Sequence, residues 1–244
     1  MKKISGKGNE ITIHLPEGRT IQVIAEEHEQ IIGWLDEANL EVKGNNNLIS
    51  FNVDNLEQLE TLLKNKGFQM MISGNGNEAN FGKIFCGYMP EWGMMGLQLI
   101  IGNWGDRTVN NTKITIGDGT GITGAMIYLQ DDNSHIQIGE NCMISWGVNI
   151  WCTDAHTITD LEGNPTNFGR FIEIGNHVWV GRDVKIGKNV KIADNNIIGW
   201  GSIVTRSIEE EHVLAVGIPA KVVKHGVDWN HQPVSRYEEG RNAM

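Results

Sequence analysis

A histidine stands in this sequence where the surrounding pattern calls for an aliphatic residue. Isoleucines recur every six positions at Ile138, Ile144 and Ile150, and the position six residues further on is His156. An imidazole buried in an aliphatic stack without a hydrogen-bond partner would cost about 1–3 kcal/mol. Histidine also exchanges a proton near neutral pH, so it can serve as a general base for a hydroxyl group. We therefore expect the chain to leave its repeat here and to present His156 at the surface.

The residues after His156 agree with this departure. The run TITDLEGNPTNFGRF has no six-residue phase and contains Gly163, Pro165 and Gly169. The phase resumes at Ile174, eighteen residues after His156. A loop that rejoins the repeat in phase would place His156 at a corner of the fold, in a cleft beneath the loop. From spacing alone, a structural histidine at the loop junction is as good an interpretation as a catalytic one.

The six-residue phase is clearest between Ile174 and Glu209. Six hexads there begin with Ile or Val and have Gly, Ala or Thr second: IGNHVW, VGRDVK, IGKNVK, IADNNI, IGWGSI and VTRSIE. Apolar spacing near 3.6 would indicate a helix and alternation by two a simple strand, and neither fits. A solenoid fits, because each hexad can form a short strand and a turn, with three hexads to a triangular coil. Each first residue should point inward and stack on the residue eighteen positions away.

These hexads, the histidine-containing loop and the following VLAVGIPAKVVK resemble the hexapeptide-repeat acyltransferases. The resemblance covers about residues 109–224 and is strongest to enzymes that O-acetylate bacterial surface polysaccharides and sialic acids. It implies a mainly β fold, a left-handed parallel β-helix with an extruded loop after His156. It also implies acetyl-CoA as co-substrate, a homotrimer that holds the donor between subunits, and direct acetyl transfer to a saccharide. The catalytic histidine of the family lies in motifs such as CTDAH, which makes His156 the expected general base.

The resemblance also implies roles for other residues. Trp179 matches a tryptophan beside the catalytic histidine, with packing at a subunit contact as an equal alternative. The expected coenzyme A contacts are Trp179, Gly181, Arg182, Trp200, Gly201, Ser202, Thr205, Arg206, Lys221 and Lys224. Arg182 and Trp200 depart from the family pattern, which has a small polar residue and an alanine at these positions. Candidates for the saccharide side are Trp146, Trp151 and Asp154, for which core packing or a simple turn is the alternative.

The charge distribution agrees with an anionic donor. Residues 174–225 contain seven Lys or Arg against five Asp or Glu, a local balance of +2 in a chain with net charge −10. The acidic total disfavours a nucleic-acid partner, and no apolar run is long enough to span a membrane. The three cysteines form no CxxC pair, which suits a reducing compartment, so we expect a cytoplasmic protein.

The sequence also allows other chemistries and other functions. Cys152 and His156 could pair as nucleophile and base, but four residues of extended chain would separate them by ~13 Å. His135, His156 and His177 are spaced by 21 residues, but no HxxxxH pair accompanies them, and no metal is expected. Rival functions are an N-acetyltransferase acting on an amino-sugar nucleotide and a non-catalytic β-helical scaffold.

The N-terminal part repeats less regularly than the rest. GKGNEITI, GNNNLISF and GNGNEANF share an Asn-rich turn followed by a short strand. We expect irregular β-helical coils over residues 1–110, the regular β-helix over 111–223 and a C-terminal tail over 224–244. A helix is predicted over 54–67, opening at an Asp54 cap and ending at Gly67, and a second helix could lie within 25–40. Both are interpreted as packing or capping elements.

Overall fold

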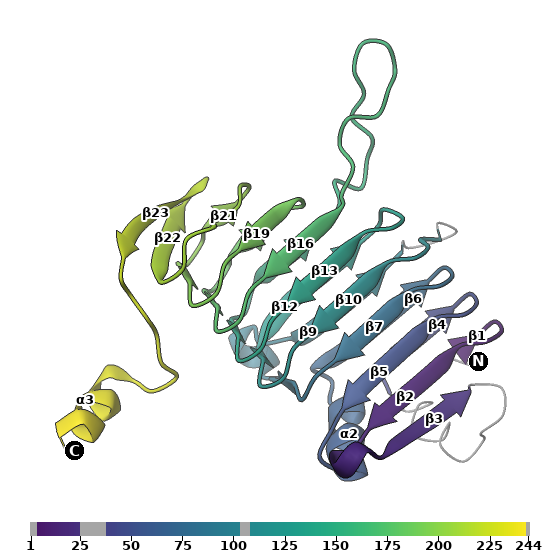
Figure 1. The fold of residues 1–244 in the computed structure, drawn as a ribbon, viewed down its shortest axis with the longest axis horizontal. Coiled ribbons are helices and arrows are strands. Elements are labelled where there is room, and N and C mark those ends of the chain that lie inside the picture. The colour runs from purple at the N-terminus through teal and green to yellow at the C-terminus, as the bar shows by residue number, and fades with distance from the viewer. Residues whose placement is uncertain (1–3, 25–37, 103–107, 243–244) are drawn as a thin grey trace.

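The chain forms a solenoid of short strands in the computed structural model, which describes residues 4–24, 38–102 and 108–242 (Figure 1). Three sheets form its sides, and the strands of each follow in spatial order. Sheet A contains β1 (Ile4–Ser5), β4 (Leu40–Lys43), β6 (Phe68–Ser73), β9 (Gly96–Ile101), β12 (Gly124–Leu129), β15 (Val148–Trp151), β18 (Lys185–Ile186) and β21 (Ile203–Val204). Sheet B contains β3 (Thr20–Ile24), β2 (Glu10–His14), β5 (Leu48–Asn52), β7 (Glu78–Phe81), β10 (Lys113–Ile116), β13 (His135–Ile138), β16 (Phe171–Ile174) and β19 (Val190–Ile192). Sheet C contains β8 (Phe85–Cys86), β11 (Gly121–Ile122), β14 (Met143–Ile144), β17 (Trp179–Val180), β20 (Ile197–Ile198), β22 (Val213–Gly217) and β23 (Ala220–His225).

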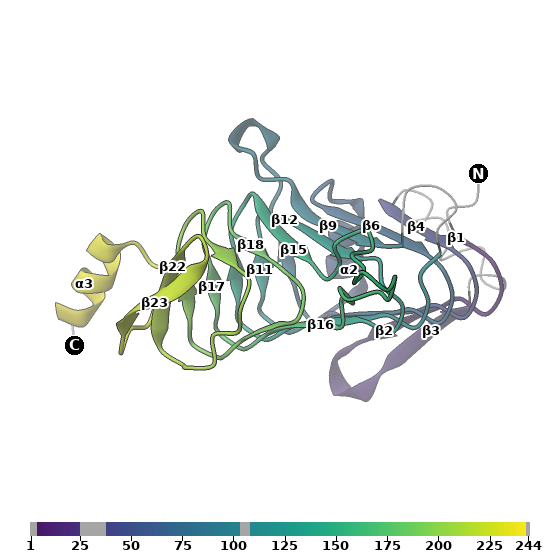
Figure 2. The ribbon, with the colours of Figure 1, turned by 90° about the horizontal axis from the view of Figure 1, so that it is seen from above.

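Successive strands visit sheets B, C and A in turn, so that β10, β11 and β12 make one coil (Figure 2). Each strand pairs in parallel with its counterpart in the next coil, and antiparallel pairs stand at the two ends, β2 with β3 and β22 with β23. We name each corner by the sheets that it joins. The A–B corner comprises residues 130–134, 152–170, 187–189 and 205–207. The B–C corner comprises 139–142, 175–178 and 193–196, and the C–A corner comprises 145–147, 181–184 and 199–202.

The register confirms the six-residue phase. Ile174 pairs with Ile192 and Ile186 pairs with Val204, each eighteen residues on, and all four side chains are buried. The sheet B position that His156 would have filled is taken by Ile174, which pairs with Ile138. The chain therefore leaves the wall before His156 and rejoins it in phase, as the sequence predicted.

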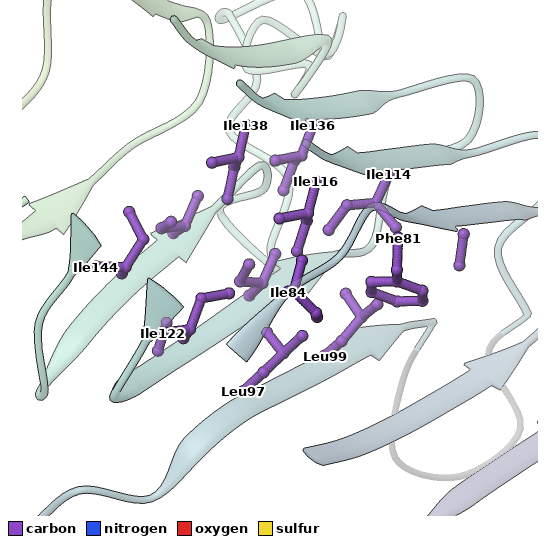
Figure 3. Packing of buried hydrophobic residues seen from close by; sticks show 14 of the residues in the cluster. Phe81, Ile84, Leu97, Leu99, Ile114, Ile116, Ile122, Ile136, Ile138 and Ile144 are labelled. Atoms are coloured by element: carbon purple, nitrogen blue, oxygen red, sulfur yellow. The ribbon is translucent and has the colours of Figure 1, made fainter. Parts of the chain in front are cut away.

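The interior is a continuous stack of aliphatic side chains. Figure 3 shows one stretch of it, where Ile114 and Ile116 lie next to Ile136 and Ile138 of the following coil. Burial of each such side chain contributes roughly 1.5–3 kcal/mol. Towards the N-terminus the stack contains larger rings, because Phe51, Phe68 and Phe81 pack together with centroids 5.2–6.0 Å apart.

Asparagines form a ladder inside the A–B corner of the first coils. Asn47 is fully buried, and its Nδ2 donates to Asn9 Oδ1 at 3.0 Å and to the Gly74 carbonyl oxygen at 2.9 Å. Asn47 Oδ1 in turn accepts from Asn77 Nδ2 at 3.1 Å, and Asn77 Oδ1 accepts from Thr112 Oγ1 at 2.9 Å. The amides thus satisfy the buried turn carbonyls of successive coils, which explains the Asn-rich turns of the N-terminal repeats.

Helix α2 (Leu56–Lys64) follows β5 and stands where the second coil would otherwise place a strand of sheet C. It buries Leu59 and Leu63 in the core. The predicted cap was wrong, because Asn55 and not Asp54 accepts from the N–H of Gln58, and the helix ends at Lys64. Asp54 instead forms an ion pair with Lys83.

Short 3₁₀ turns and a terminal helix complete the described chain. The turns are η1 (Pro16–Gly18) and η2 (Pro90–Trp92), and α3 (Val234–Asn242) lies clear of the sheets in Figures 1 and 2. The second predicted helix falls mostly on residues 25–37, outside the described residues, and Leu40 at its end belongs to β4. Strand β7 pairs with β10, so sheet B is continuous across position 110. The predicted boundaries between the N-terminal coils, the regular β-helix and the tail, at 110 and 223, stay predictions. None of the described helices has the length and apolar character needed to cross a membrane.

Candidate functional site

His156 is presented on a strained turn within the A–B corner. Its backbone N–H donates to the Asp154 carbonyl oxygen at 2.7 Å, which closes a γ-turn around Ala155. Ala155 has φ +60°, a left-handed conformation that residues other than glycine seldom adopt. The Ala155 N–H donates to Oγ1 of the buried Thr153 at 2.9 Å. Strain of this kind persists only where surrounding structure enforces it, and it concentrates at functional sites.

Three polar side chains hold this turn. Asn167 Nδ2 donates to Asp154 Oδ2 and to the His156 carbonyl oxygen, each at 2.8 Å. Lys188, one coil further along the same corner, forms an ion pair with Asp154 and donates to the Asn167 carbonyl oxygen. Burial acts to raise the pKa of Asp154, but hydrogen bonds from Lys188 and Asn167 outweigh it and hold that pKa below its ordinary value. Among the described residues, no hydrogen bond or ion pair engages the exposed His156 imidazole, which is therefore available to a ligand.

Asp131 joins the two ends of the loop. Its Oδ2 accepts from the Gly169 N–H at 2.7 Å, and its Oδ1 accepts from Thr153 Oγ1 at 3.4 Å. A Cβ added at Gly169 would lie 2.1 Å from the Cys152 carbonyl oxygen, so only glycine fits where the loop returns past its own start. The loop consequently stands out from the wall between β15 and β16, as Figure 1 shows.

A cavity of about 530 Å³ opens beneath the loop beside His156, a volume suited to a small ligand. It is lined by Thr108, Val109, Gln130, Asp131, Thr153, Asp154, Ala155, His156, Thr157, Pro165, Asn167 and Phe168. Trp151, on the strand that leads into the turn, packs edge-on against Tyr128 with ring centroids 5.5 Å apart. The Tyr128 hydroxyl accepts from Nε2 of the lining residue Gln130 at 2.6 Å. Trp151 is thus near the cavity, and its role on the saccharide side stays a prediction.

The cysteines offer no ready nucleophile. Cys152 is buried at the start of the loop, and burial together with the Asp131 charge raises its pKa to about 12. Cys86 and Cys142 are also free and buried, and burial raises their pKa values to about 12 and about 11. A buried neutral thiol is a poor nucleophile, so the geometry gives no support to a Cys152–His156 pair.

The other two evenly spaced histidines lie elsewhere. His135 begins β13 and lies 3.4 Å from Glu173, whereas His177 lies at the B–C corner and stacks on Trp229 with centroids 4.3 Å apart. Within residues 4–24, 38–102 and 108–242, no group of three or more His, Cys, Asp and Glu side chains is arranged to hold a metal ion.

The C–A corner carries a stack of aromatic and cationic side chains. The Arg182 guanidinium lies between two indoles, 5.4 Å from the Trp146 ring centroid and 5.0 Å from that of Trp200. Asp183 Oδ2 accepts from Arg182 Nε at 3.0 Å and from Trp200 Nε1 at 3.1 Å. Trp146, predicted on the saccharide side, therefore belongs with the predicted coenzyme residues Arg182 and Trp200, a whole side of the coil away from the His156 turn.

Trp179 lies on the outer face of sheet C, away from the A–B corner of the same chain. Its Nε1 donates to Ser145 Oγ at 3.4 Å, and its ring lies 6.2 Å from that of the buried Trp229. Trp229 is fixed by stacking on His177 and by a 2.8 Å hydrogen bond from its Nε1 to the His177 carbonyl oxygen. Within one chain, the structure does not bring Trp179 and His156 together.

The remaining predicted coenzyme residues divide between three places. Gly181 and Gly201 lie at the C–A corner, Thr205 and Arg206 are exposed at the A–B corner, and Lys221 and Lys224 are exposed on β23. Ser202 does not reach the surface. It is fully buried, its Oγ donates to the Gly199 carbonyl oxygen at 2.6 Å, and it accepts from the Gly217 N–H at 3.1 Å. This hydroxyl shapes the turn and has no free position for a ligand.

Sequence reasoning missed several residues that support the site. Lys188 was counted only as a basic charge, although its place one coil after the loop could have been found by counting hexads. The sequence did not indicate Asn167 and Asp131 as supporting residues, because both bind backbone groups of the loop, which has no six-residue period. Trp229 was assigned to a tail and left without a role.

Comparison with known proteins identifies the fold. No protein-family model matches the chain, and a search of curated proteins found no match. The polySia-specific acetyltransferase NeuO superposes with a TM-score of 0.67 and 22% identity, over 98% of this chain and 96% of its own. The polysialic acid O-acetyltransferase OatWY superposes with a TM-score of 0.64 and 22% identity, over 97% and 95%. The chain is a left-handed parallel β-helix.

This assignment confirms the predicted fold, and the superpositions extend through the irregular N-terminal coils of the β-helix as well. At 22% identity the likeness concerns the fold alone, so the chemistry of this β-helix rests on its own residues.

Proposed function

We propose that the protein is an acetyl-CoA-dependent O-acetyltransferase that modifies a saccharide, with His156 as the general base. The observation that carries this proposal is the presentation of His156. An imidazole with no partner among the described residues stands at a cavity of about 530 Å³, on a strained turn held by Asp154, Asn167 and Lys188. A merely structural histidine would not need such support.

The reaction is a direct transfer. His156 takes the proton of a saccharide hydroxyl while the hydroxyl oxygen attacks the thioester carbonyl carbon. The tetrahedral oxyanion needs a preorganised N–H donor. The backbone N–H groups of Trp179 and Gly181 are donated to the next coil, so the donor on this strand is the Trp179 indole Nε1, which has only a long 3.4 Å contact to Ser145 Oγ. The C–S bond then breaks, the coenzyme A sulfur leaves and receives the proton from His156, and the O-acetyl saccharide departs. General-base assistance of this kind is worth ~10²–10⁴ in rate.

The site is completed by a second subunit. His156 and Trp179 lie on different sides of one β-helix, so they can meet only across an interface. The outer face of sheet C has an uncharged row formed by Phe85, Gly121, Met143, Trp179, Ile197 and Leu214. Sheet B differs, because its outer face carries the ion pairs of Lys113 with Glu78 and Lys191 with Glu173. Sheet C is therefore the side suited to a neighbour, in a closed trimer.

Sheet C also offers a path for the donor. Beside the row that contains Trp179 and Ile197 runs a second row with Gly181 and Gly199, where the next coil comes so close that a Cβ would lie 2.7 Å from the Ile198 carbonyl oxygen and 2.4 Å from the Val216 side chain. In the same register, the next strand after Gly199 carries Val216, which pairs with Lys221 on β23. Lys221 is therefore three strand intervals, or about 14 Å, from Gly181. An extended pantetheine arm lying on this row would place the thioester near Trp179 and the phosphates near Lys221.

The neighbouring A–B corner matches this path. On one corner, His156, Lys188 and Arg206 follow each other at successive coils. With the threefold axis parallel to the β-helix axis, equivalent coils of adjacent subunits lie at the same height, so the neighbour would offer His156 at the thioester and Arg206 at the phosphates. Arginine and lysine side chains are suited to phosphate oxygens.

The acceptor is assigned to the cavity beneath the loop. Its lining is rich in hydroxyl, amide and carboxylate groups, and Trp151 beside it offers an apolar ring to a sugar face. The two similar structures belong to enzymes whose names state polysialic acid as substrate, so this polymer is the first acceptor to test. Three free cysteines suit a reducing compartment, and we place the reaction in the cytoplasm.

Calorimetric titration of the purified protein with acetyl-CoA tests the donor assignment. We expect micromolar binding to the wild type and a loss of at least tenfold in the Lys221→Glu/Arg206→Glu double variant. The charge-matched control is the double variant Lys66→Glu/Lys113→Glu, at two exposed lysines away from the proposed donor path. A folded wild-type protein that does not bind acetyl-CoA would overturn the proposed function.

A further inference from the structure

Trp200 is an exposed indole that is nevertheless held in a fixed orientation. The residue is 69% exposed, yet the Arg182 guanidinium covers one face of the ring at 5.0 Å and Asp183 Oδ2 accepts from its Nε1 at 3.1 Å. Asp183 also binds Arg182 at 3.0 Å, and Arg182 rests on Trp146 on its other side. Among the described residues, no ring or cation contact covers the second face of Trp200. The indole is therefore oriented before any ligand arrives.

The turn that carries Trp200 is uncrowded at its next residue. Gly201 follows Trp200 with φ +69°, and a Cβ added there would meet nothing within 4 Å. The next turn on this corner is Gly217–Ala220, whose Ile218 side chain is exposed. An exposed ring between a glycine and an open turn can accept a flat ligand on its free face.

Positive charge lies close to this ring. Gly199, the residue before Trp200, packs against Val216, and Val216 pairs with Lys221, so Lys221 is two strand intervals or about 10 Å away. Paired residues on antiparallel strands share a face, which places Lys221 and Lys224 on the outer side of sheet C. A flat ring beside cationic side chains suits a nucleotide, whose base stacks and whose phosphates pair with the lysines.

Arg182 favours a nucleobase over a sugar as the stacking partner. The cation on the covered face draws the π electrons of Trp200 towards itself, because cation–π attraction acts on the ring quadrupole. The free face is then poorer in electrons, which weakens its attraction for sugar C–H groups and leaves it suited to the π-face of a base.

We propose that the free face of Trp200 stacks on the adenine of coenzyme A, so that the protein selects nucleotide-bearing thioesters over phosphopantetheine thioesters carried by a protein. This inference rests on the proposed function. It explains why the corner carries Arg182 and Trp200, since Arg182 orients the indole and Trp200 binds the base. Base–aromatic stacking supports an effect of about tenfold or more on affinity.

Calorimetry on the full chain tests the proposal with three probes: coenzyme A, adenosine 3′,5′-bisphosphate and 4′-phosphopantetheine. In Trp200→Ala, we expect the Kd of coenzyme A and of the bisphosphate to rise at least tenfold and that of phosphopantetheine to change less than twofold. Trp200→Phe, which keeps an aromatic face, should remain within about threefold of the wild type for all three. Trp92→Ala removes an indole of similar exposure, 71%, on another turn and should change none of the three constants.

The outcomes separate the two proposals. Equal binding of coenzyme A by the wild type and by folded Trp200→Ala would overturn the stacking role and leave the acetyltransferase proposal intact. A changed oligomeric state with unchanged coenzyme A affinity, or weakened binding of polysialic acid alone, would also overturn it and assign the ring to a subunit contact or to the acceptor. No binding of coenzyme A by the wild type would overturn both.

Discussion

Lys188 and Asp154, thirty-four residues apart in sequence, form an ion pair directly beneath the turn that presents His156. Lys188 also donates to the carbonyl oxygen of Asn167, whose amide binds the His156 carbonyl oxygen. The coil after the loop thereby fixes the geometry of a residue on the loop. The histidine owes its position to the stacking of coils as well as to its local sequence.

Removal of the lysine should loosen this turn without affecting the donor site. We expect Lys188→Met to lower kcat about tenfold, equivalent to ~1.4 kcal/mol, with little change in the affinity for acetyl-CoA. Lys188→Arg should recover part of the loss. Lys185→Met, which removes an exposed lysine on β18 of the same coil, is the matched control. Equal kcat values for Lys188→Met and Lys185→Met would show that the ion pair does not position His156.

The same ion pair sets a pH dependence. The pKa of Asp154 is lowered from the ordinary value of 3.8, so its contribution to stability is fully present above that value and is lost as pH falls through the folded-state pKa. We expect the Asp154 carboxyl signal in a carbon NMR titration to have its midpoint below pH 3.8. In Lys188→Met the midpoint should move upwards. A wild-type midpoint above 4 would contradict the observed contacts.

The buried asparagine ladder should be important for stability. Asn47→Ala leaves the Gly74 carbonyl oxygen and the Asn77 backbone N–H without a partner in the core. Asn9 Oδ1 keeps the backbone N–H of residue 47, and Asn77 Nδ2 keeps the Val109 carbonyl oxygen. At about 1–3 kcal/mol for each of these two unsatisfied buried groups, we expect the free energy of unfolding to fall by at least ~2 kcal/mol. Chemical denaturation measures this difference.

Asn45 supplies the matched control for the ladder. It belongs to an exposed ladder, in which its Nδ2 donates to Asn75 Oδ1 at 3.1 Å. Because water can replace that partner, Asn45→Ala should cost less than ~1 kcal/mol. Equal losses for the two variants would mean that burial does not decide the strength of these ladders.

Complementation between two inactive variants tests the composite site. His156→Ala and Trp179→Ala should each be inactive alone. If His156 of one subunit faces Trp179 of the next, each mixed trimer contains one intact interface, and random mixing should restore about a quarter of wild-type activity. Co-expression with two different affinity tags, followed by activity measurement, gives the answer. No recovery in proven mixed trimers would show that both residues act within one subunit.

Much of the fold could be predicted because a solenoid repeats its information. The inward Ile and Val of each hexad and their eighteen-residue stacking follow from sequence period alone, and Ile174 with Ile192 bears this out. Helix α2 was predicted, but its cap was not, because Asp54 and Asn55 are both good caps and the ion pair of Asp54 with Lys83 decides between them.

The candidate site was predictable only in part. His156 was recognisable because it broke a pattern, but the residues that hold it belong to an aperiodic loop and to the following coil. Arg182 and Trp200 are eighteen residues apart, so counting hexads could have placed them side by side. Trp146 lies before the aperiodic loop, and its place beside Arg182 follows only from where the phase resumes. Ser202 matches a motif, yet its hydroxyl is occupied inside the turn.

The most direct test of the account is the steady-state turnover of acetyl-CoA by wild type and His156→Ala with polysialic acid as acceptor, read as free thiol released. We predict that the variant binds acetyl-CoA as tightly as the wild type and that its kcat is lower by ~10²–10⁴. Wild-type turnover by a folded His156→Ala variant would contradict the central claim, because the proton of the acceptor would then be taken by another group.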